Sequence, residues 1–285
     1  MPKHYDHNEK AGNEGDMCKH PALVAALEET IALTGHSPFR YADLFAGYAR
    51  NPLAKGKEWA RGIGLVAGAP LLAANPHVSL WANCAGLTKT PTTDGFYPGY
   101  PGSACFAKCV GDRLAKSVEL WLWEVAPAPY DDLKVSFPHA HIFDTAAQPG
   151  DPAIQNADFV FIDPPDKTCW GTISKIVQSL CPRRAVLIWL PLCANTTTTP
   201  PTEDQQSIKC RNEALELGMC ASVVRWSTGG RTIGCQLLYR LDASARLALI
   251  DAVEAVVLAA RRQQTKSRNW GYPVIHHEPC SREAA

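Results

Sequence analysis

Several features that would assign this sequence of 285 residues to other classes of protein are missing. No apolar run approaches the roughly 18 residues that a membrane-spanning helix needs, which excludes an integral membrane protein of that kind. The first twenty residues contain no apolar segment followed by small residues, so nothing there marks the chain for export. We therefore expect a cytoplasmic protein that does not bind a membrane.

Two glycine-rich nucleotide-binding patterns are absent as well. No G-x-G-x-x-G follows the first predicted strand, and Gly62 and Gly64 lie within a helical pattern, which argues against nicotinamide or flavin binding. The pattern G-x-x-x-x-G-K-[ST] does not occur, so the sequence offers no P-loop for a nucleoside triphosphate.

The sequence also lacks an excess of charge, with 28 Lys and Arg residues against 28 Asp and Glu residues. Proteins dedicated to nucleic acids usually carry a basic excess, because their cations displace the counterions of the phosphates. The balance argues against tight, nonspecific binding of RNA or DNA. A local basic face is still compatible with it.

Cysteine is plentiful, but no C-x-x-C motif occurs. The count of eleven is odd, and the chain is long enough to form a core without crosslinks, so we expect mostly buried free thiols. Cys105 and Cys109 are four apart on a predicted helix, without a second pair of that spacing, and we expect them to pack in the core. His276, His277 and Cys280 lie near a flexible terminus, which seldom holds ligands in fixed geometry. We predict no metal site.

What the sequence does contain is a regular alternation of strand and helix patterns. Short apolar runs rich in β-branched and aromatic residues predict strands, and apolar residues at helical spacing predict helices. The predicted helices span 21–34, 104–115, 171–181, 203–218 and 244–263, and the predicted strands span 40–45, 117–124, 139–144, 157–163, 183–192, 222–227 and 232–241. This order predicts an α/β fold of the Rossmann-like class I methyltransferase type, with a mostly parallel sheet and an antiparallel pair of strands at its C-terminal end.

Residues 46–96 interrupt the alternation directly after the first strand. The sequence KEWARGIGLVAGAPLLAAN predicts a helix, and the following TKTPTTDGFYPGYPG predicts a loop. We expect an inserted helical subdomain here. The expected organisation is an N-terminal motif, helix and first strand (1–45), the insertion (46–96), the remainder of the domain (97–262) and a C-terminal tail (263–285).

Three of the predicted strands end in an acid. The distance from Ser103 to Glu124 is 21 residues, from Glu124 to Asp144 it is 20, and from Asp144 to Asp163 it is 19. Acids at the carboxyl ends of parallel strands can bind a nucleoside cofactor, with Glu124 on the ribose hydroxyls and Asp144 on the adenine amino group. The alternative is that each acid only solvates the end of a strand.

Small residues near two other predicted turns would complete the cofactor site. The segments Asp43 to Gly47 and Pro101 to Ser103 let backbone amides at a helix N-terminus approach the methionine half of S-adenosylmethionine (SAM). These segments and the three strand-end acids together predict SAM as the cofactor.

The most specific motif is Asp163-Pro164-Pro165-Asp166, which follows the apolar run FVFI. Proline fixes its own φ and restricts the residue before it, so the Asp163 carboxylate and an adjacent carbonyl are held rigidly. Together they can accept both hydrogens of an exocyclic amine and turn the nitrogen lone pair toward the methyl group of SAM. The alternative is an ordinary turn that ends a strand.

The motifs resemble those of the RlmJ-type methyltransferases, which methylate the N6 amine of one adenine in bacterial large-subunit ribosomal RNA. The resemblance covers residues 5 to 242. It is carried by the order and spacing of AGNEGDMCKH at 11–20, Asp43 to Gly47, Phe96 to Pro98, Pro101 to Ser103, Glu124, Asp144 and Asp163 to Pro165. If it holds, it implies SAM contacts from His20, Asp43, Phe45, Gly47, Ser103, Glu124, Asp144, Thr145 and Asp163, a catalytic motif of Asp163 to Asp166, and substrate contacts from Tyr5, Lys19 and Asp166.

This sequence departs from the family pattern at two positions. Asp166 replaces an aromatic residue that would stack on the flipped base, and Phe45 stands where the family tends to have a histidine. Base stacking on an aromatic side chain contributes roughly 1 to 3 kcal/mol, so the loss bears on the choice of substrate. Trp170 or Trp189 could supply another aromatic surface, or Asp166 could pair with a cationic or amine-rich substrate.

Three functions therefore stay open at the level of sequence. The first is an adenine N6-methyltransferase that acts on ribosomal RNA. The second keeps the fold and the cofactor but transfers the methyl group to a small-molecule or protein amine. The third is a catalytically inactive module that binds SAM or RNA.

Overall fold

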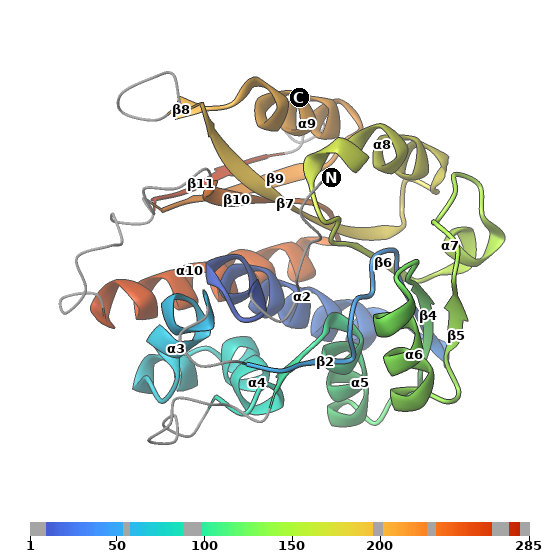
Figure 1. Cartoon of the computed structure of the whole chain (residues 1–285), viewed down its shortest axis with the longest axis horizontal. Helices are drawn as coiled ribbons and strands as arrows, with labels where there is room; N and C mark the ends of the chain where they lie inside the picture. Colours follow the sequence, from blue (N-terminus) through green and yellow to red (C-terminus); the bar gives the residue numbers. More distant parts are fainter. Residues whose placement is uncertain are drawn as a thin grey trace.

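The computed structural model describes residues 10–53, 58–87, 99–195, 202–226, 232–263 and 274–279. Its centre is a nine-stranded sheet in which eight strands follow the order β11-β9-β10-β7-β6-β1-β4-β5, and β8 pairs with the end of β7 (Figure 1). The strands are β1 (Phe39–Asp43), β4 (Val118–Trp123), β5 (His141–Phe143), β6 (Phe159–Ile162), β7 (Ala185–Asn195), β8 (Thr202–Glu203), β9 (Cys220–Arg225), β10 (Thr232–Arg240) and β11 (Val274–Glu278).

The strand directions confirm the predicted fold class. Strands β5, β4, β1, β6 and β7 are parallel to one another, whereas β10, β9 and β11 continue the sheet in antiparallel pairs. From β1, which lies inside the sheet, the chain builds outward through β4 and β5 on one side and through β6 and β7 on the other. Such a reversal of strand order opens a crevice at the carboxyl ends of the strands, where ligands bind in α/β proteins.

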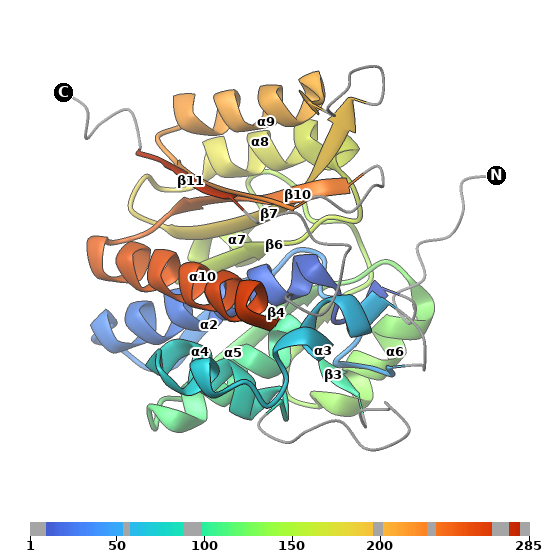
Figure 2. The ribbon, with the colours of Figure 1, turned by 90° about the vertical axis from the view of Figure 1, so that its left-hand side faces the viewer.

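Helices cover both faces of the sheet (Figure 2). The helices on one face are α2 (Glu14–Leu33), α4 (Pro76–Cys84), α5 (Ser103–Arg113), α6 (Pro127–Ser136) and α10 (Ala243–Gln263), and those on the other face are α7 (Pro152–Asn156), α8 (Trp170–Ser179) and α9 (Gln205–Glu216). Helix α2 packs against α10, α5 and α4 and against strands β7 and β10, which explains why most of its side chains are buried.

Two layers of hydrophobic core result from the alternation of side chains along each strand. Phe159 and Phe161 of β6 pack toward α2, and Val160 and Ile162 pack toward α8. A strand that is buried on both faces has a continuous apolar sequence, as FVFI does.

The segment after β1 differs from the single helix predicted there. It forms the short antiparallel strands β2 (Arg50–Asn51) and β3 (Tyr100–Pro101) and, between them, the separate helical turns η1 (Glu58–Arg61), α3 (Ile63–Val66) and η2 (Pro70–Ala73), followed by α4. Pro70 and Pro76 each start a new helical turn, because proline lacks the amide that would continue the previous one. Gly68 has a φ of 72°, which ends α3.

One glycine of this segment permits a close contact with the N-terminal motif. A Cβ atom at Gly62 would lie 2.2 Å from the carbonyl oxygen of Gly12, and the amide of Ile63 donates to that oxygen at 2.9 Å. The insertion therefore packs directly against the residues that begin α2.

The C-terminal segment also differs from the flexible tail that the sequence suggested. Residues 274–278 form β11, which pairs with β9 and extends the sheet. His277 Nδ1 lies 2.7 Å from the Ser222 hydroxyl, and Glu278 forms an ion pair with Arg211 at 3.3 Å. The expectation of flexibility is wrong for these residues, because long-range strand pairing holds them.

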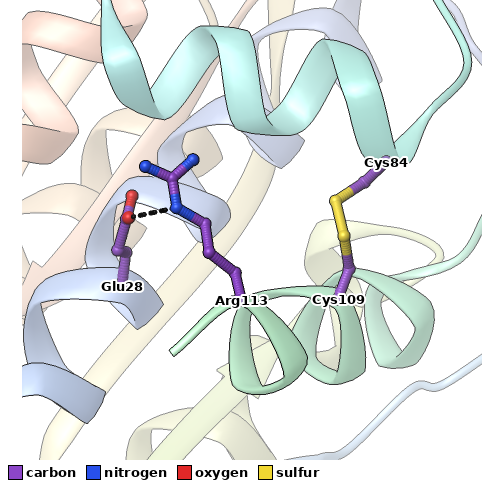
Figure 3. Close-up of a disulfide and its surroundings, with 4 residues drawn as sticks. All are labelled: Glu28, Cys84, Cys109 and Arg113. Atoms are coloured by element: carbon purple, nitrogen blue, oxygen red, sulfur yellow. Dashed lines mark ion pairs between the residues drawn. A yellow bond between two sulfur atoms is a disulfide. The ribbon is translucent and has the colours of Figure 1, made fainter. Parts of the chain in front are cut away.

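Two cysteines form a disulfide that the sequence did not predict. Cys84, at the end of α4, is bonded to Cys109 of α5 (Figure 3). Arg113, one turn farther along α5, pairs with Glu28 of α2 at 3.2 Å, so α5 is tied to both of its neighbours. Four of the other described cysteines are buried: Cys18, Cys210, Cys220 and Cys235.

Removing the disulfide should destabilise the chain. A crosslink between residues 25 apart stabilises a protein by about 3 kcal/mol, chiefly by restricting the unfolded chain. We expect the double variant Cys84→Ser, Cys109→Ser to unfold at a lower temperature than the unaltered chain in oxidising buffer, measured by circular dichroism. Cys181→Ser is the matched control, because Cys181 is exposed and free. The difference should vanish under reducing conditions, and equal melting temperatures in oxidising buffer would contradict the prediction.

Candidate functional site

Four acids gather at the carboxyl edge of the sheet. Asp43 is the last residue of β1, and Glu124, Asp144 and Asp163 follow directly after β4, β5 and β6. These strands are parallel neighbours, so their carboxyl ends meet at the same edge. The acids differ in exposure, because Asp43 is completely buried and Asp144 is exposed.

The carboxylate of Asp43 organises the turn after β1. Its Oδ1 accepts the amide of Phe45 at 3.2 Å, and its Oδ2 accepts the hydroxyls of Tyr41 and Ser103. Ser103 is the first residue of α5, so this contact joins the start of α5 to the end of β1. Burial raises the pKa of Asp43 to about 7, although its three donors oppose the shift.

Glu124 joins the same turn to the start of α6. Its Oε2 accepts the amide of Gly47 at 2.9 Å, and its Oε1 accepts the amide of Ala126 at 2.7 Å. Gly47 has a φ of 62°, a conformation that L side chains rarely adopt. Each carboxylate oxygen has a second lone pair, so Glu124 can still accept hydrogen bonds from a ligand.

A largely apolar cavity of about 190 Å³ opens beside Glu124. Phe45 and Glu124 border it from the ends of β1 and β4, and Thr145 borders it from the end of β5. Asp144 is not among its lining residues. The full lining is Leu44, Phe45, Trp123, Glu124, Val125, Thr145, Ala146, Ala147, Cys169, Thr172, Ile173 and Ile176.

His20 of α2 is buried between the side chains of Tyr100 and Phe106. Its Nδ1 lies 2.8 Å from the hydroxyl of Tyr100, which also accepts the indole N–H of Trp81 at 3.1 Å. The ring of Phe106 packs against His20 with centroids 4.9 Å apart. Burial, with a contribution from the neighbouring Lys19 charge, lowers the pKa of His20 to about 3, so the imidazole is neutral.

A charged contact at the edge joins Lys19 to Asp163. The Lys19 ammonium lies 2.5 Å from Asp163 Oδ2 and 2.6 Å from Asp16 Oδ1, within α2. Burial alone would lower the pKa of Lys19, but the two carboxylates outweigh it and raise that pKa above its ordinary value. Lys19 is therefore a permanent cation next to the acid of the Asp-Pro-Pro motif.

Trp189 of β7 lies next to this charged group. Ile188 of β7 pairs in register with Ile162 of β6. Trp189 and Asp163 are the next residues after these two, so they lie side by side. The Lys19 ammonium is 5.3 Å from the centroid of the Trp189 ring, a cation–π contact. A side chain at Gly15 would meet that ring, since a Cβ there would lie 2.7 Å from it, so α2 approaches β7 closely.

The fourth residue of the motif has a local structural role. Asp166 is exposed, and its Oδ1 accepts the amide of Thr168 at 2.7 Å, which caps the helical turn η3 (Lys167–Cys169). Pro164 is buried and Pro165 is exposed. Trp170 cannot offer a stacking surface, because it is 2% exposed and its indole N–H donates to Glu213 at 2.5 Å.

Sequence reasoning found the strand-end acids but missed several of their partners. It did not identify Asp16, Tyr41 or Tyr100 as contacts of Lys19, Asp43 and His20. Tyr5 lies outside the described residues. Within the described ranges, no group of three or more His, Cys, Asp or Glu residues could hold a metal ion. The described helices include none that is both long and apolar enough to span a membrane.

Comparisons with known proteins concern the fold. No family model matches the chain, and no curated protein matches it. A Legionella pneumophila protein of the family DUF519 aligns with a TM-score of 0.67 at 19% identity, over 95% of this chain and 98% of that one. An Aquifex aeolicus SAM-dependent methyltransferase aligns with a TM-score of 0.36 at 9% identity, over 82% and 97% of the two chains. The plantazolicin methyltransferase BamL aligns with a TM-score of 0.40 at 9% identity, over 95% and 86%.

The alignment with the Legionella protein covers both chains almost completely, so the two proteins share a fold over nearly their whole length. The strand order and directions are those of the predicted Rossmann-like fold, a mostly parallel sheet with antiparallel strands at its C-terminal end.

The raised pKa of Asp43 predicts how the stability of the chain depends on pH. In the unfolded chain Asp43 loses its proton near pH 3.8, whereas in the folded chain it keeps the proton up to about pH 7. The folded state binds the extra proton in this window, so stability falls as pH rises through it and levels off above pH 7. Asparagine does not ionise. The melting temperature of Asp43→Asn relative to the unaltered chain should therefore rise from pH 4 to 7 and then stay level, and a constant difference would contradict the raised pKa.

Proposed function

We propose that this chain is a SAM-dependent N-methyltransferase whose acceptor is the N6 amine of an adenine in ribosomal RNA. The observation that carries the proposal is the position of Asp163. Its carboxylate follows β6, is fixed by two prolines, and lies at the edge of the sheet that also carries Glu124 and Asp43. An enzyme that acts on ribosomal RNA would work in the cytoplasm.

The residues at this edge fit SAM in shape and in their hydrogen-bonding groups. The cavity beside Glu124 and Phe45 is largely apolar, as an adenine ring requires, and it is large enough to hold that part of SAM. Glu124 is placed to accept hydrogen bonds from the ribose, and the start of α5 at Ser103 offers amides to the carboxylate of the methionine half.

The methyl group comes from SAM, and the chain supplies the position of the acceptor. Asp163 and the carbonyl of Pro164 accept the two N–H groups of the amine, which frees the nitrogen lone pair from conjugation with the ring. The lone pair forms the new bond to the methyl carbon as the carbon–sulfur bond breaks. The methylated nitrogen then releases a proton to water. Positioning of this kind provides most of the rate enhancement. No residue needs to remove a proton before attack, because the nitrogen becomes acidic only once it is methylated.

Trp189 is the aromatic residue that we assign to the acceptor side. It lies beside Asp163 and is partly buried, whereas Trp170 is enclosed by the core. Its ring would compensate for the missing aromatic residue at position 166. The carboxylate of Asp166 caps η3, so its presence does not by itself require an amine-rich substrate.

A second acceptor class is a small-molecule or protein amine. The observation that favours it is the exposed Asp166 next to the catalytic acid, together with the zero net charge of the chain. A third reading, an inactive module that binds SAM or RNA, predicts binding of SAM without transfer to any cellular fraction.

Replacement of the motif acid tests the proposed site. We expect Asp163→Ala to reduce transfer of labelled methyl to ribosomal RNA by at least about a hundredfold, because the acceptor amine loses its positioning. SAM binding, measured by calorimetry, should persist in this variant. The matched control is Glu124→Ala, which should lose SAM binding instead. Full turnover in Asp163→Ala would refute the assignment of the site.

The residue at position 166 distinguishes the two acceptor classes. For an adenine acceptor, Asp166→Tyr restores a stacking surface and should maintain or increase transfer to RNA. For a cationic acceptor, the same change removes a counter-charge and should lower transfer. Asp166→Asn is the matched control, because it can still cap η3 without carrying a charge. Labelled RNA, DNA, protein and metabolite pools are compared for each variant.

A further inference from the structure

Asp16 belongs to the N-terminal motif, yet the proposed reaction gives it no role. It is held in place from two directions: its Oδ2 accepts the amide of Gly12 at 2.6 Å, and its own amide donates to the side chain of Asn13 at 3.1 Å. Its remaining carboxylate oxygen, Oδ1, lies 2.6 Å from the Lys19 ammonium. Asp16 is thus a fixed carboxylate at the base of the site.

One ammonium group is shared between two carboxylates. The Lys19 side chain is 8% exposed, and its ammonium contacts Asp16 at 2.6 Å and Asp163 at 2.5 Å. The Asp163 side chain is the more exposed of the two acids, at 23% against 15% for Asp16. The acid that faces the acceptor side is therefore the one from which Lys19 can be displaced, and Asp16 lies deeper.

We propose that Asp16 is a positioning residue that retains the Lys19 ammonium when the acceptor amine takes its place on Asp163. This inference rests on the proposed function. The acceptor must donate one of its N–H groups to Asp163, where Lys19 is bonded in the ligand-free chain. A buried ammonium without a counter-charge is strongly unfavourable, so Lys19 can leave Asp163 only if another carboxylate holds it.

The same arrangement favours the transfer step. The acceptor nitrogen gains positive charge as it binds the methyl group, and a cation on Asp163 would repel that charge. With Lys19 held by Asp16, the Asp163 carboxylate is available to stabilise the developing cation. The Trp189 ring, 5.3 Å from the ammonium, stabilises Lys19 in the same region.

A purely structural role for Asp16 makes a different prediction. If Asp16 only accepted the amide of Gly12, then asparagine would serve equally well, because its side-chain oxygen can accept the same bond. Asp16→Asn therefore removes the charge while keeping the local hydrogen bond. Of the two carboxylates, only Asp163 then still carries a charge that can pair with Lys19. The acceptor must therefore compete with a tighter ion pair between Lys19 and Asp163.

The experiment is a double-mutant cycle of Asp16→Asn and Lys19→Met on the full chain. The acceptor is deproteinised large-subunit ribosomal RNA from bacteria. We expect Asp16→Asn to lower kcat and to raise KM for the RNA, with a combined loss in kcat/KM of about tenfold or more, whereas Kd for SAM stays within about twofold. Asp16→Glu should recover part of the loss. The combined variant should be no worse than Lys19→Met alone, because Asp16 acts only through Lys19.

The outcomes separate this inference from the proposed function. Unchanged kcat and KM in Asp16→Asn would overturn the role of Asp16. Losses in the combined variant that equal the sum of the two single losses would overturn it as well. In both cases, transfer that depends on Asp163 would still support the proposed function. Absence of transfer by the unaltered chain would overturn both. If Asp16→Asn does not fold by circular dichroism, the cycle uses Asp16→Glu, whose loss must likewise disappear in the Lys19→Met background.

Discussion

The structure at the carboxyl edge of the sheet depends on one buried ammonium group. Lys19 neutralises part of the charge of Asp16 and Asp163, which the low-dielectric interior would otherwise oppose. To reach that position, α2 must lie directly on the sheet, and Gly15 allows this because a side chain there would collide with Trp189. Gly15 and Lys19 lie about one turn apart in α2, and Asp163 lies far along the chain after β6, but all three meet one geometric requirement.

The sheet and its acids could be predicted because their signals are local. A run such as FVFI can be satisfied only by a strand buried on both faces, and parallel strands place the acids that follow them at one edge. This reasoning predicts the positions of Asp43, Glu124 and Asp163 at the edge of the sheet. The same reasoning could not separate the buried Asp43 from the exposed Asp144, because burial depends on how the neighbouring turns pack.

The features that sequence reasoning missed all depend on contacts between distant segments. The disulfide joins Cys84 to Cys109 because α4 and α5 pack side by side, and nothing in the spacing of the cysteines shows this. Residues 274–278 are ordered by β9, whose edge they cover. The helix expected after β1 is broken where Gly62 contacts the backbone of Gly12. Helical propensity cannot predict a contact of this kind, because the two residues are far apart in the sequence.

The packing of α2 against α10 has a consequence for synthesis of the protein. The segment that carries Lys19, Glu14–Leu33, is synthesised before α10, Ala243–Gln263, because it precedes that helix in the chain. Until then, the apolar surface of α2 has no permanent cover on that side. The charged group around Lys19 can form only after Asp163, which follows β6, and Trp189 of β7 have been synthesised, and α10 covers α2 later still.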